Sequence, residues 1–372
     1  MIPLFRPNYD EQEIDALRAV FDSHWLGLGP RTAEFEEKLA EYLGVKYVVA
    51  LNSATAALHL ALAALNIKKG DEVIVPSLTF ISPAHAVMYC GATPVFVDVD
   101  PITLLADIDD VASKITDRTQ AIIHVHYAGR VENIEPLRKL AGDIPIVEDA
   151  AHAMGAEYNH QKGGTFGTIG CFSFHAVKNL AAGDGGALVT ESKEIYDKTV
   201  RMRWLGIDKS TWARASDGKK ETSYSWQYHV KEIGFKYHMN DINAALGLSQ
   251  LKKLDRNNKK RTILATRYHQ LLSGITELQL PPADTDKIQS SWHLYAVQTA
   301  HRDKLIEHLK AAGIATGVHY YPIHLYDCYP DTPTLPITEK AGDQVMSLPM
   351  YPDMTLVEQD IVCNSIRSFF TT

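Results

Sequence analysis

Hydrophobic and polar positions alternate regularly over the first half of the chain. Between about residues 46 and 190, short runs rich in β-branched residues are separated by segments with helical periodicity. The predicted strands are Glu72–Val75, Pro94–Val97, Ala121–Val125, Pro145–Glu148, Cys171–Phe174 and Ala187–Val189. The predicted helices between them are Thr55–Leu65, Pro83–Cys90, Ile108–Ile115 and Ile134–Leu140. This alternation predicts an α/β fold with a mostly parallel sheet covered by helices on both faces.

The pattern changes in the second half of the chain. Residues 208–232 are polar and aromatic, which predicts an excursion or a lid-like loop. A long helical region follows from about Asn240 to Leu272, with a break expected near 255–258. A new α/β pattern begins beyond about residue 275. We therefore expect a large domain over residues 1–250 and a smaller C-terminal domain over residues 251–372.

Composition and charge exclude several classes of protein. The 372 residues are 45% hydrophobic and 22% charged, which is typical of a globular chain and not of a disordered one. The net charge of -8 disfavours nucleic acids and anionic membranes as partners. Four cysteines without a C-x-x-C pair indicate a reduced, cytoplasmic protein. Neither a signal peptide nor a membrane-spanning segment is evident.

A polar segment, residues 52–58, follows the apolar run Tyr47–Leu51 and opens an amphipathic helix. Ser53 is a good N-cap residue, and Thr55 lies in the first turn. The N–H groups of a first helical turn and the helix dipole favour an anion, and hydroxyl groups add further donors. The segment therefore predicts either a phosphate-binding helix start or an ordinary capped helix.

Two carboxylates, Glu148 and Asp149, stand at the end of a predicted strand. An acid at the carboxyl end of a parallel strand can meet a cationic ring nitrogen or a metal, because ligands gather at that edge. A solvated strand end is the ordinary alternative, since most acidic side chains are exposed.

A lysine, Lys178, follows another predicted strand and precedes a glycine-rich segment, residues 183–186. A lysine held among apolar groups can have a lowered pKa and act as a nucleophile toward carbonyls. Ser173 adds a hydroxyl for an anion site. A single lysine is usually an exposed surface charge. The lysine segment therefore indicates a site only together with the helix start and the strand-end acids.

Together the three segments predict a pyridoxal phosphate site. The helix start would bind the phosphate, Lys178 would hold the cofactor aldehyde as a Schiff base, and Asp149 would pair with the protonated pyridine nitrogen. Phe80, which follows a predicted strand, is expected either to stack on the ring or to lie in the core.

These segments resemble the DegT/DnrJ/EryC1/StrS group of sugar aminotransferases, which are fold-type I pyridoxal phosphate enzymes. The matching segments are residues 52–56, 76–80, 148–152, 173–179, 234–245 and 316–322. The resemblance covers most of the chain, and the lysine segment is its most specific motif. It implies an aspartate-aminotransferase-like fold, with a mostly parallel mixed sheet and a smaller C-terminal α/β domain. The N-terminal arm, about residues 1–30, is expected to pack on that smaller domain.

The resemblance also implies roles for single residues. Lys178 is the expected catalytic residue, as the Schiff-base lysine and proton shuttle. The expected cofactor contacts are Thr55, Ala56 and Ser173 at the phosphate, Phe80 on the ring, Asp149 at the pyridine nitrogen and His152 near the 3-hydroxyl. His152 stands where the family often has glutamine. In the family, segment 234–245 reaches the neighbouring subunit's phosphate, so Lys236 is expected to serve a second active site in a homodimer.

Several histidines invite a metal hypothesis, which the sequence disfavours. His124 and His126 alternate on one strand face, but no carboxylate or thiolate clusters with them at ligand spacing. His319, Tyr321 and His324 are expected instead to line the site of a sugar nucleotide.

The resemblance implies a pyridoxal phosphate-dependent aminotransferase that moves an amino group from glutamate to a nucleotide-linked 4-keto sugar. Its product would serve surface polysaccharide, such as lipopolysaccharide, or secondary metabolism. Lys236, with segments 126–129 and 212–214, resembles the UDP-4-amino-4-deoxy-arabinose aminotransferase branch, which favours amination at C4.

Four alternatives remain open at this stage. A sugar dehydratase of the same fold is disfavoured because such relatives replace the lysine with histidine, whereas Lys178 is present. A keto-cyclitol aminotransferase is a further alternative, which an assay of scyllo-inosose beside nucleotide sugars would decide. A non-enzymatic regulator is disfavoured by the complete cofactor set and by the lack of a DNA-binding module. A nicotinamide-dependent oxidoreductase would need a G-x-G-x-x-G segment after an early strand, and none occurs.

Overall fold

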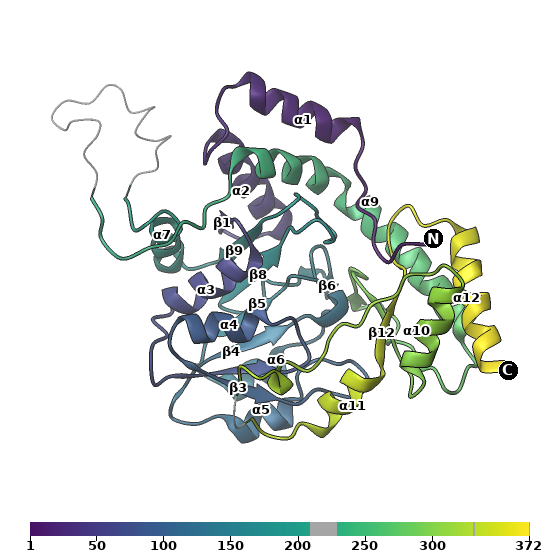
Figure 1. Cartoon of the computed structure of the whole chain (residues 1–372). Coiled ribbons are helices and arrows are strands. Elements are labelled where there is room, and N and C mark those ends of the chain that lie inside the picture. The colour runs from purple at the N-terminus through teal and green to yellow at the C-terminus, as the bar shows by residue number, and fades with distance from the viewer. Residues whose placement is uncertain (209–228, 330–331, 372) are drawn as a thin grey trace.

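A seven-stranded sheet forms the centre of the molecule in the computed structural model, which describes residues 1–208, 229–329 and 332–371. The strand order is β1-β9-β8-β5-β4-β2-β3 (Figure 1). The strands are β1 (Tyr47–Leu51), β2 (Glu72–Pro76), β3 (Thr93–Val97), β4 (Thr119–Val125), β5 (Ile146–Asp149), β8 (Ile169–Ser173) and β9 (Gly186–Thr190). β9 runs antiparallel to both neighbours, and the other pairs are parallel.

The strand sequences explain why both faces of this sheet are covered. Every residue of β2, β5, β8 and β9 is buried, as expected for strands with helices on both sides. Helices α3 (Ala54–Ala64), α4 (Ser82–Tyr89) and α7 (Lys193–Met202) contribute to the core on one face. Helices α2 (Pro30–Leu43), α5 (Ile108–Lys114) and α6 (Glu135–Ala141) contribute to the core on the other.

One long helix, α9 (Asp241–Leu272), joins this sheet to the C-terminal part of the chain. The predicted break near 255–258 is wrong, because the helix is continuous over all 32 residues. Its polar residues in that region have partners on other elements. Asp255 accepts a hydrogen bond of 2.6 Å from the Tyr42 hydroxyl, and Asn258 donates one of 2.9 Å to the Met154 carbonyl. The polar residues that suggested a break therefore contact other elements around the central sheet.

The C-terminal part of the chain has its own core. It is built from the end of α9 with β11 (Tyr295–Gln298), β12 (Val345–Leu348), α10 (Arg302–Ala311) and α12 (Leu356–Thr371). A separate small sheet pairs β6 (Glu157–Tyr158) with β7 (Gln161–Lys162) and β10 (Ile288–Gln289). Residues of α9 contribute to the large core as well as to this one, so the proposed division at residue 250 falls inside a shared helix.

The N-terminal arm lies on both parts of the molecule. Ile2 is buried in the C-terminal core and pairs with Ile314, and the Leu4 carbonyl accepts a hydrogen bond from Met350. Helix α1 (Glu11–Asp22) then lies alongside α9 (Figure 1).

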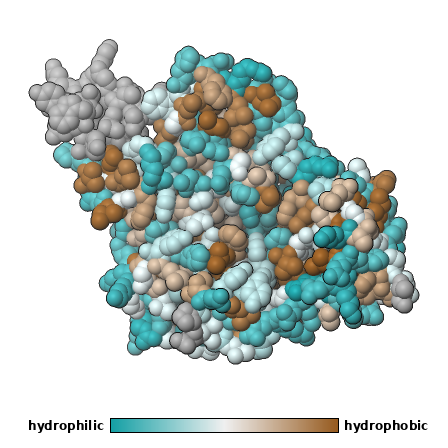
Figure 2. Space-filling view, in the orientation of Figure 1, coloured by the Kyte–Doolittle hydropathy of each residue, from teal (hydrophilic) through white to brown (hydrophobic). Residues whose placement is uncertain are grey.

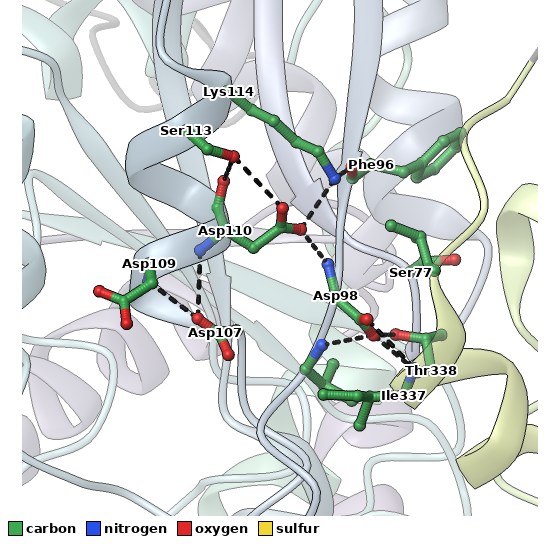
Figure 3. A network of polar contacts seen from close by, with 12 residues as sticks. Ser77, Phe96, Asp98, Asp107, Asp109, Asp110, Ser113, Lys114, Ile337 and Thr338 are labelled. Atoms are coloured by element: carbon green, nitrogen blue, oxygen red, sulfur yellow. Dashed lines mark hydrogen bonds and ion pairs between the residues drawn. The ribbon is translucent and has the colours of Figure 1, made fainter.

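A polar network fixes α11 (Pro336–Gln344) to the end of β3 (Figure 3). The Asp98 carboxylate accepts hydrogen bonds from the backbone N–H groups of Ile337 and Thr338, at 3.1 and 2.6 Å. It thereby caps a helix whose own N-cap residue, Leu335, makes no side-chain cap bond. The Asp98 N–H in turn donates to Asp110, which pairs with Lys114. This network holds α11 against the carboxyl end of β3.

Within residues 1–208, 229–329 and 332–371, no helix is both long enough and apolar enough to span a bilayer.

Candidate active site

A cavity of about 350 Å³ opens at the carboxyl ends of the parallel strands. Such an edge is where ligands bind in open α/β sheets. Most of the residues predicted from the sequence line it, namely Thr55, Phe80, Asp149, His152, Ser173, Lys178 and His319. They come from the last residues of β5 and β8, from segments that follow β1, β2, β5 and β8, and from a segment beyond α10. The fold therefore assembles side chains that are far apart in the sequence.

Lys178 lies in a turn that follows β8. Its backbone N–H donates to the His175 carbonyl at 2.8 Å, and Phe174 bonds to both Ala182 and Gly185 across the loop. Burial lowers the pKa of Lys178 to about 8, although the nearby Asp149 carboxylate acts in the opposite direction. The side chain is partly exposed, and it lines the cavity. Part of the Lys178 population is therefore the neutral, nucleophilic amine near physiological pH.

The neighbouring residue, Asn179, anchors this turn to two other elements. Its amide donates hydrogen bonds to the Asn258 side chain at 2.8 Å and to the Ser291 carbonyl at 2.7 Å. Its carbonyl oxygen lies 3.1 Å from Nδ1 of His293. The position of Lys178 is thus fixed by contacts with α9 and with the segment before β11.

Asp149 ends β5 and lines the same cavity. Its Oδ1 accepts a hydrogen bond of 3.0 Å from the Ala151 N–H. Burial raises the pKa of Asp149, while that N–H group, Lys178 and His126 lower it. A cationic group bound beside this carboxylate would stabilise its ionised form.

His152 approaches the cavity from the loop after β5. Its Nε2 lies 3.1 Å from the Tyr320 hydroxyl, and its ring lies 4.4 Å from that of His293. Burial holds the pKa of His152 well below its usual value, so the ring is neutral. Its Nδ1 has no hydrogen-bond partner among the described residues. Because the Tyr320 hydroxyl can donate to Nε2, the ring proton can then lie on Nδ1.

The start of α3 forms another wall of the cavity. Ser53 is its N-cap and accepts a hydrogen bond of 3.1 Å from the Ala56 N–H. The Ala56 N–H, which was expected to contact the phosphate, is therefore already bonded to the Ser53 side chain. The Thr55 hydroxyl lies 2.7 Å from that of Ser82. A Cβ on Gly186 would come within 2.5 Å of Ala54 N, so a glycine is required where β9 approaches the helix start.

Four of the predicted residues do not line this cavity, namely Ala56, Lys236, Tyr321 and His324. His324 is buried elsewhere, with Nδ1 2.6 Å from the Ser77 hydroxyl and Nε2 3.3 Å from Glu339. Lys236 extends over the Trp204 ring, with Nζ 3.4 Å from its centroid. Residues 212–214, which contributed to the branch resemblance, lie outside the described residues, as does most of the predicted lid-like loop.

The structure adds residues that the sequence did not single out. Tyr320, Ser82, Asp184 and His175 line the cavity. Tyr320 directly follows His319, and Ser82 follows Phe80 closely, so a wider reading of the same two segments would have included them.

The chain was then compared with known proteins. The model of the DegT/DnrJ/EryC1/StrS aminotransferase family matches residues 7–367. Protein MJ1066 of Methanocaldococcus jannaschii, which is uncharacterized, is 39% identical over 98% of this chain and 97% of its own length.

Solved structures agree with the family match. The aminotransferase TlmJ of Streptoalloteichus hindustanus superimposes with a TM-score of 0.93 at 34% identity, covering 100% of this chain and 99% of its own. Spr1654 of Streptococcus pneumoniae, described as a candidate sugar aminotransferase and solved in its PMP form, gives a TM-score of 0.92 at 30% identity, with 100% and 99% coverage.

These matches confirm the predicted fold class and the prediction that the protein is an enzyme. Enzymes of this family depend on pyridoxal phosphate, so the predicted cofactor is confirmed as well. The chain belongs to the DegT/DnrJ/EryC1/StrS aminotransferase family.

Proposed function

We propose that this protein transfers an amino group from glutamate to a nucleotide-linked 4-keto sugar, with pyridoxal phosphate as cofactor. One observation carries the proposal: Lys178, Asp149 and the start of α3 meet at a single cavity. A nucleophilic amine, a buried acid and an anion-binding helix start are the three groups that this cofactor requires.

The residues present fit pyridoxal phosphate. Asp149 is buried at the cavity wall, and no basic side chain hydrogen-bonds to its carboxylate among the described residues. It would hold the cationic ring nitrogen, while His152 Nδ1 would donate to the 3-hydroxyl. Thr55, Ser173 and the N–H groups of the first turn of α3 would hold the phosphate. Phe80 is 56% exposed and lines the cavity, so its ring is available for stacking.

The cofactor, when bound, supplies an aldehyde that bonds covalently to amines and a pyridine ring that withdraws electrons. The chain supplies the proton transfers. With a pKa near 8, the Lys178 amine can accept a proton from the Cα of a bound amino acid and return it at a neighbouring carbon. Beside a cationic ring nitrogen, Asp149 would keep its negative charge and would stabilise that cation.

The assignment of the substrate depends on the family and on the resemblance of the chain. Spr1654 is described as a candidate sugar aminotransferase, and the lysine form at Lys236 resembles an enzyme branch that aminates C4 of a nucleotide sugar. His319 lines the cavity beside the cofactor groups and supplies a candidate contact for the sugar nucleotide.

We also propose a homodimer in which Lys236 serves the partner's active site. Lys236 does not line the cavity of its own chain. The segment next to it exposes apolar side chains, with Ile233 89% and Val230 59% exposed. Figure 2 shows hydrophobic surface at the α7 end of the molecule, close to this segment. Exposed apolar groups of this kind favour burial against another chain.

Covalent trapping tests the role of Lys178. The purified holoenzyme is reduced with borohydride, digested and analysed by peptide mass spectrometry. The cofactor mass should appear on the peptide that contains Lys178 and should be lost in Lys178→Ala. The exposed Lys139 provides a matched control, since Lys139→Ala should keep the adduct. An adduct that remains on another lysine at full stoichiometry would contradict the assignment.

A substrate panel tests the reaction itself. UDP-, dTDP- and GDP-linked 4-keto sugars are incubated with glutamate, beside scyllo-inosose, and the products are identified by mass spectrometry and NMR. Amination at C4 of a nucleotide sugar is expected. Amination only at C3 contradicts the positional assignment, and amination only of scyllo-inosose favours a keto-cyclitol substrate.

Subunit mixing tests the shared site. The variants Lys178→Ala and Lys236→Ala are each expected to be nearly inactive as homodimers. In a mixed dimer, one site combines the native Lys178 of one subunit with the native Lys236 of the other. Mixing should therefore restore up to about a quarter of the wild-type activity, because half of the dimers are mixed and each has one complete site. Mixtures that remain inactive would show that both lysines act within one chain.

A further inference from the structure

A buried serine holds one imidazole of the active-site cavity from behind. His319 lines the cavity, and its Nδ1 lies 2.9 Å from the hydroxyl of Ser347 on β12. Ser347 is fully buried, and its hydroxyl makes no other hydrogen bond within the described part of the chain. Because Ser347 does not itself line the cavity, any effect that it has on the reaction must pass through His319.

Three further contacts fix the position of this imidazole. Gly317, two residues before it, exchanges both backbone hydrogen bonds with Ser347, at 2.8 and 3.3 Å. The Tyr127 hydroxyl donates to the His319 carbonyl. Phe5 packs edge-on against the ring, with centroids 5.9 Å apart. The ring is therefore held by β12, by the segment after β4 and by the N-terminal arm.

The burial of Ser347 determines which ring nitrogen carries the proton. If Ser347 accepted a hydrogen bond from Nδ1, its own O–H would be buried without an acceptor, which is unfavourable. If Ser347 donates to Nδ1 instead, its hydrogen is paired. Burial lowers the pKa of His319 to about 4, so the ring is neutral and carries a single N–H at physiological pH. That proton therefore lies on Nε2.

The other ring nitrogen of His319 is available to a ligand. Nε2 has no hydrogen-bond partner among the described residues, and it is not one of the unpaired polar atoms that the protein encloses completely. The two nitrogens of an imidazole point away from each other, so a ring bonded to Ser347 through Nδ1 directs Nε2 away from β12. Because the ring lines the cavity, its Nε2–H is presented to the space where a substrate lies.

A neutral N–H donor suits a neutral oxygen better than it suits an anion. Carboxylates and phosphates gain most from charged donors, and Lys178 is the only lysine or arginine that lines this cavity in the ranges that the structure describes. A keto sugar offers neutral hydroxyl and keto oxygens. The expected partner of the His319 Nε2–H is therefore an oxygen of the sugar and not the carboxylate of glutamate.

We propose that Ser347 is a positioning residue for the sugar half of the reaction. By donating to Nδ1 of His319, it fixes an Nε2–H that donates to a hydroxyl or keto oxygen of the bound sugar. This inference rests on the proposed function, which supplies the keto sugar as the amino acceptor. It gives Ser347 no part in the half-reaction with glutamate.

Chemical labelling of the holoenzyme tests the contact without any substrate. Diethyl pyrocarbonate acylates the unprotonated nitrogen of a neutral imidazole. In the wild type that nitrogen of His319 is Nδ1, which Ser347 blocks, so labelling should be slow. In Ser347→Ala the proton is free to lie on either nitrogen, so labelling should rise about tenfold, equivalent to one hydrogen bond. Peptide mass spectrometry measures it, with the exposed His24 as the internal reference.

Single-turnover kinetics test the consequence for the reaction. The absorbance of the cofactor follows the half-reaction with glutamate alone, and then the half-reaction of the aminated enzyme with a UDP-linked 4-keto sugar. Ser347→Ala should lower kcat/KM for the sugar about tenfold and should change that for glutamate less than about twofold. Thr190→Val is the control, since Thr190 is a buried hydroxyl that donates to the Thr168 carbonyl at 2.9 Å and does not line the cavity. It should leave both half-reactions unchanged.

A double-mutant cycle shows whether Ser347 acts through His319. In a His319→Phe background, the addition of Ser347→Ala should cause no further loss with the sugar. Ser347→Cys keeps the size and a weaker donor, so its activity should lie between those of Ser347→Ala and the wild type. If Ser347→Ala fails to fold, Ser347→Cys takes its place in all three measurements.

Four results would overturn the proposal. Labelling of His319 in the wild type as fast as that of His24 would show that Nδ1 is not held. Equal losses in the two half-reactions would indicate a merely structural role for Ser347. A full further loss in the His319→Phe background would show that Ser347 acts by another route. A wild type with protected His319 that aminates no UDP-linked 4-keto sugar would contradict the sugar contact and the proposed function, whereas the contact between Ser347 and His319 would stand.

Discussion

The His126 Nε2–H donates a hydrogen bond of 2.6 Å to Oε2 of Glu148, and both side chains are fully buried. Glu148 also accepts hydrogen bonds from the backbone N–H groups of Gly164 and Phe166, at 2.8 and 2.6 Å. Burial alone would raise the pKa of Glu148, but His126 and the N–H groups of Gly167 and Gly164 lower it overall. An ionised carboxylate therefore joins β4, β5 and the loop before β8, directly beside Asp149.

Neutralising this carboxylate should destabilise the fold. Glu148→Gln keeps the shape but leaves buried N–H groups with a weaker acceptor, so the free energy of unfolding should fall by about 3 kcal/mol. Urea denaturation measures the change. The control is Glu135→Gln, because Glu135 pairs with Arg138 on the exposed surface, where such pairs contribute about 1 kcal/mol or less.

The same variant gives a pH test. The pKa of Glu148 is lower in the folded state, so its stabilisation is present above the ordinary value of 4.5 and is lost as the pH falls through the folded pKa. The difference in stability between wild type and Glu148→Gln should therefore shrink below about pH 4.5. A difference that stays constant down to acid unfolding would show that Glu148 is not ionised in the native protein.

Lys178 should react at a lower pH than other lysines of the cofactor-free protein. Its pKa of about 8 means that the reactive neutral amine appears as the pH rises through that value. Exposed lysines require a pH near their ordinary pKa of about 10.4. Competitive labelling with acetic anhydride, read by peptide mass spectrometry, measures both in one sample. Half-maximal labelling of Lys178 near pH 10 would contradict the expectation.

Tyr320 should support cofactor binding through His152. Tyr320→Phe removes the hydroxyl that lies 3.1 Å from His152 Nε2, so the imidazole loses the contact that leaves the proton on Nδ1. The dissociation constant for pyridoxal phosphate should rise about three- to tenfold, equivalent to one hydrogen bond. Equilibrium dialysis measures it. Tyr326→Phe is the control, since Tyr326 is exposed and does not line the cavity.

Asp241 should stabilise the fold by capping a distant helix. Its carboxylate accepts hydrogen bonds from the backbone N–H groups of Gly29 and Thr32, at 3.0 and 2.9 Å, where α2 begins. Gly29 is the N-cap residue of α2 and has no side chain to do this. Asp241→Ala should lower the free energy of unfolding by about 2 kcal/mol, at the upper end for a cap, because Asp241 is buried.

A solvent-exposed cap provides the comparison for this variant. Asp10 caps α1 through its own side chain, which also lies 2.8 Å from the Lys253 ammonium group, and Asp10→Ala should lower the free energy of unfolding by less than Asp241→Ala does. Equal losses in the two variants would show that the long-range contact of Asp241 adds nothing to local capping.

The sequence predicted the central sheet well because its strands are short apolar runs between helical segments. The predicted strand Glu72–Val75 corresponds to β2, Glu72–Pro76, and the predicted helix Thr55–Leu65 corresponds to α3, Ala54–Ala64. These elements are specified by local periodicity. The break predicted near residue 255 was wrong, because the partners of the polar side chains there lie on other elements of the fold.

The candidate site also contains some residues whose place the sequence predicts and others whose place only the fold determines. Asp149 and Lys178 follow predicted strands, so their meeting at one edge of the sheet was predictable from the strand order of α/β folds. His319 and Tyr320 reach the cavity from beyond α10, and nothing local distinguishes them from Tyr321 and His324, which do not. Only the path of the chain after α10 separates the two pairs.

Helix α9 has a consequence for how the chain can be divided. Its 32 residues form a rod of about 48 Å, with Leu254 in the core around the sheet and Tyr268 in the C-terminal core. A fragment that stops near residue 250 would cut this rod and leave apolar surface of both cores open to water. The two parts should therefore melt together as one cooperative unit, and either part expressed without the other should aggregate rather than fold.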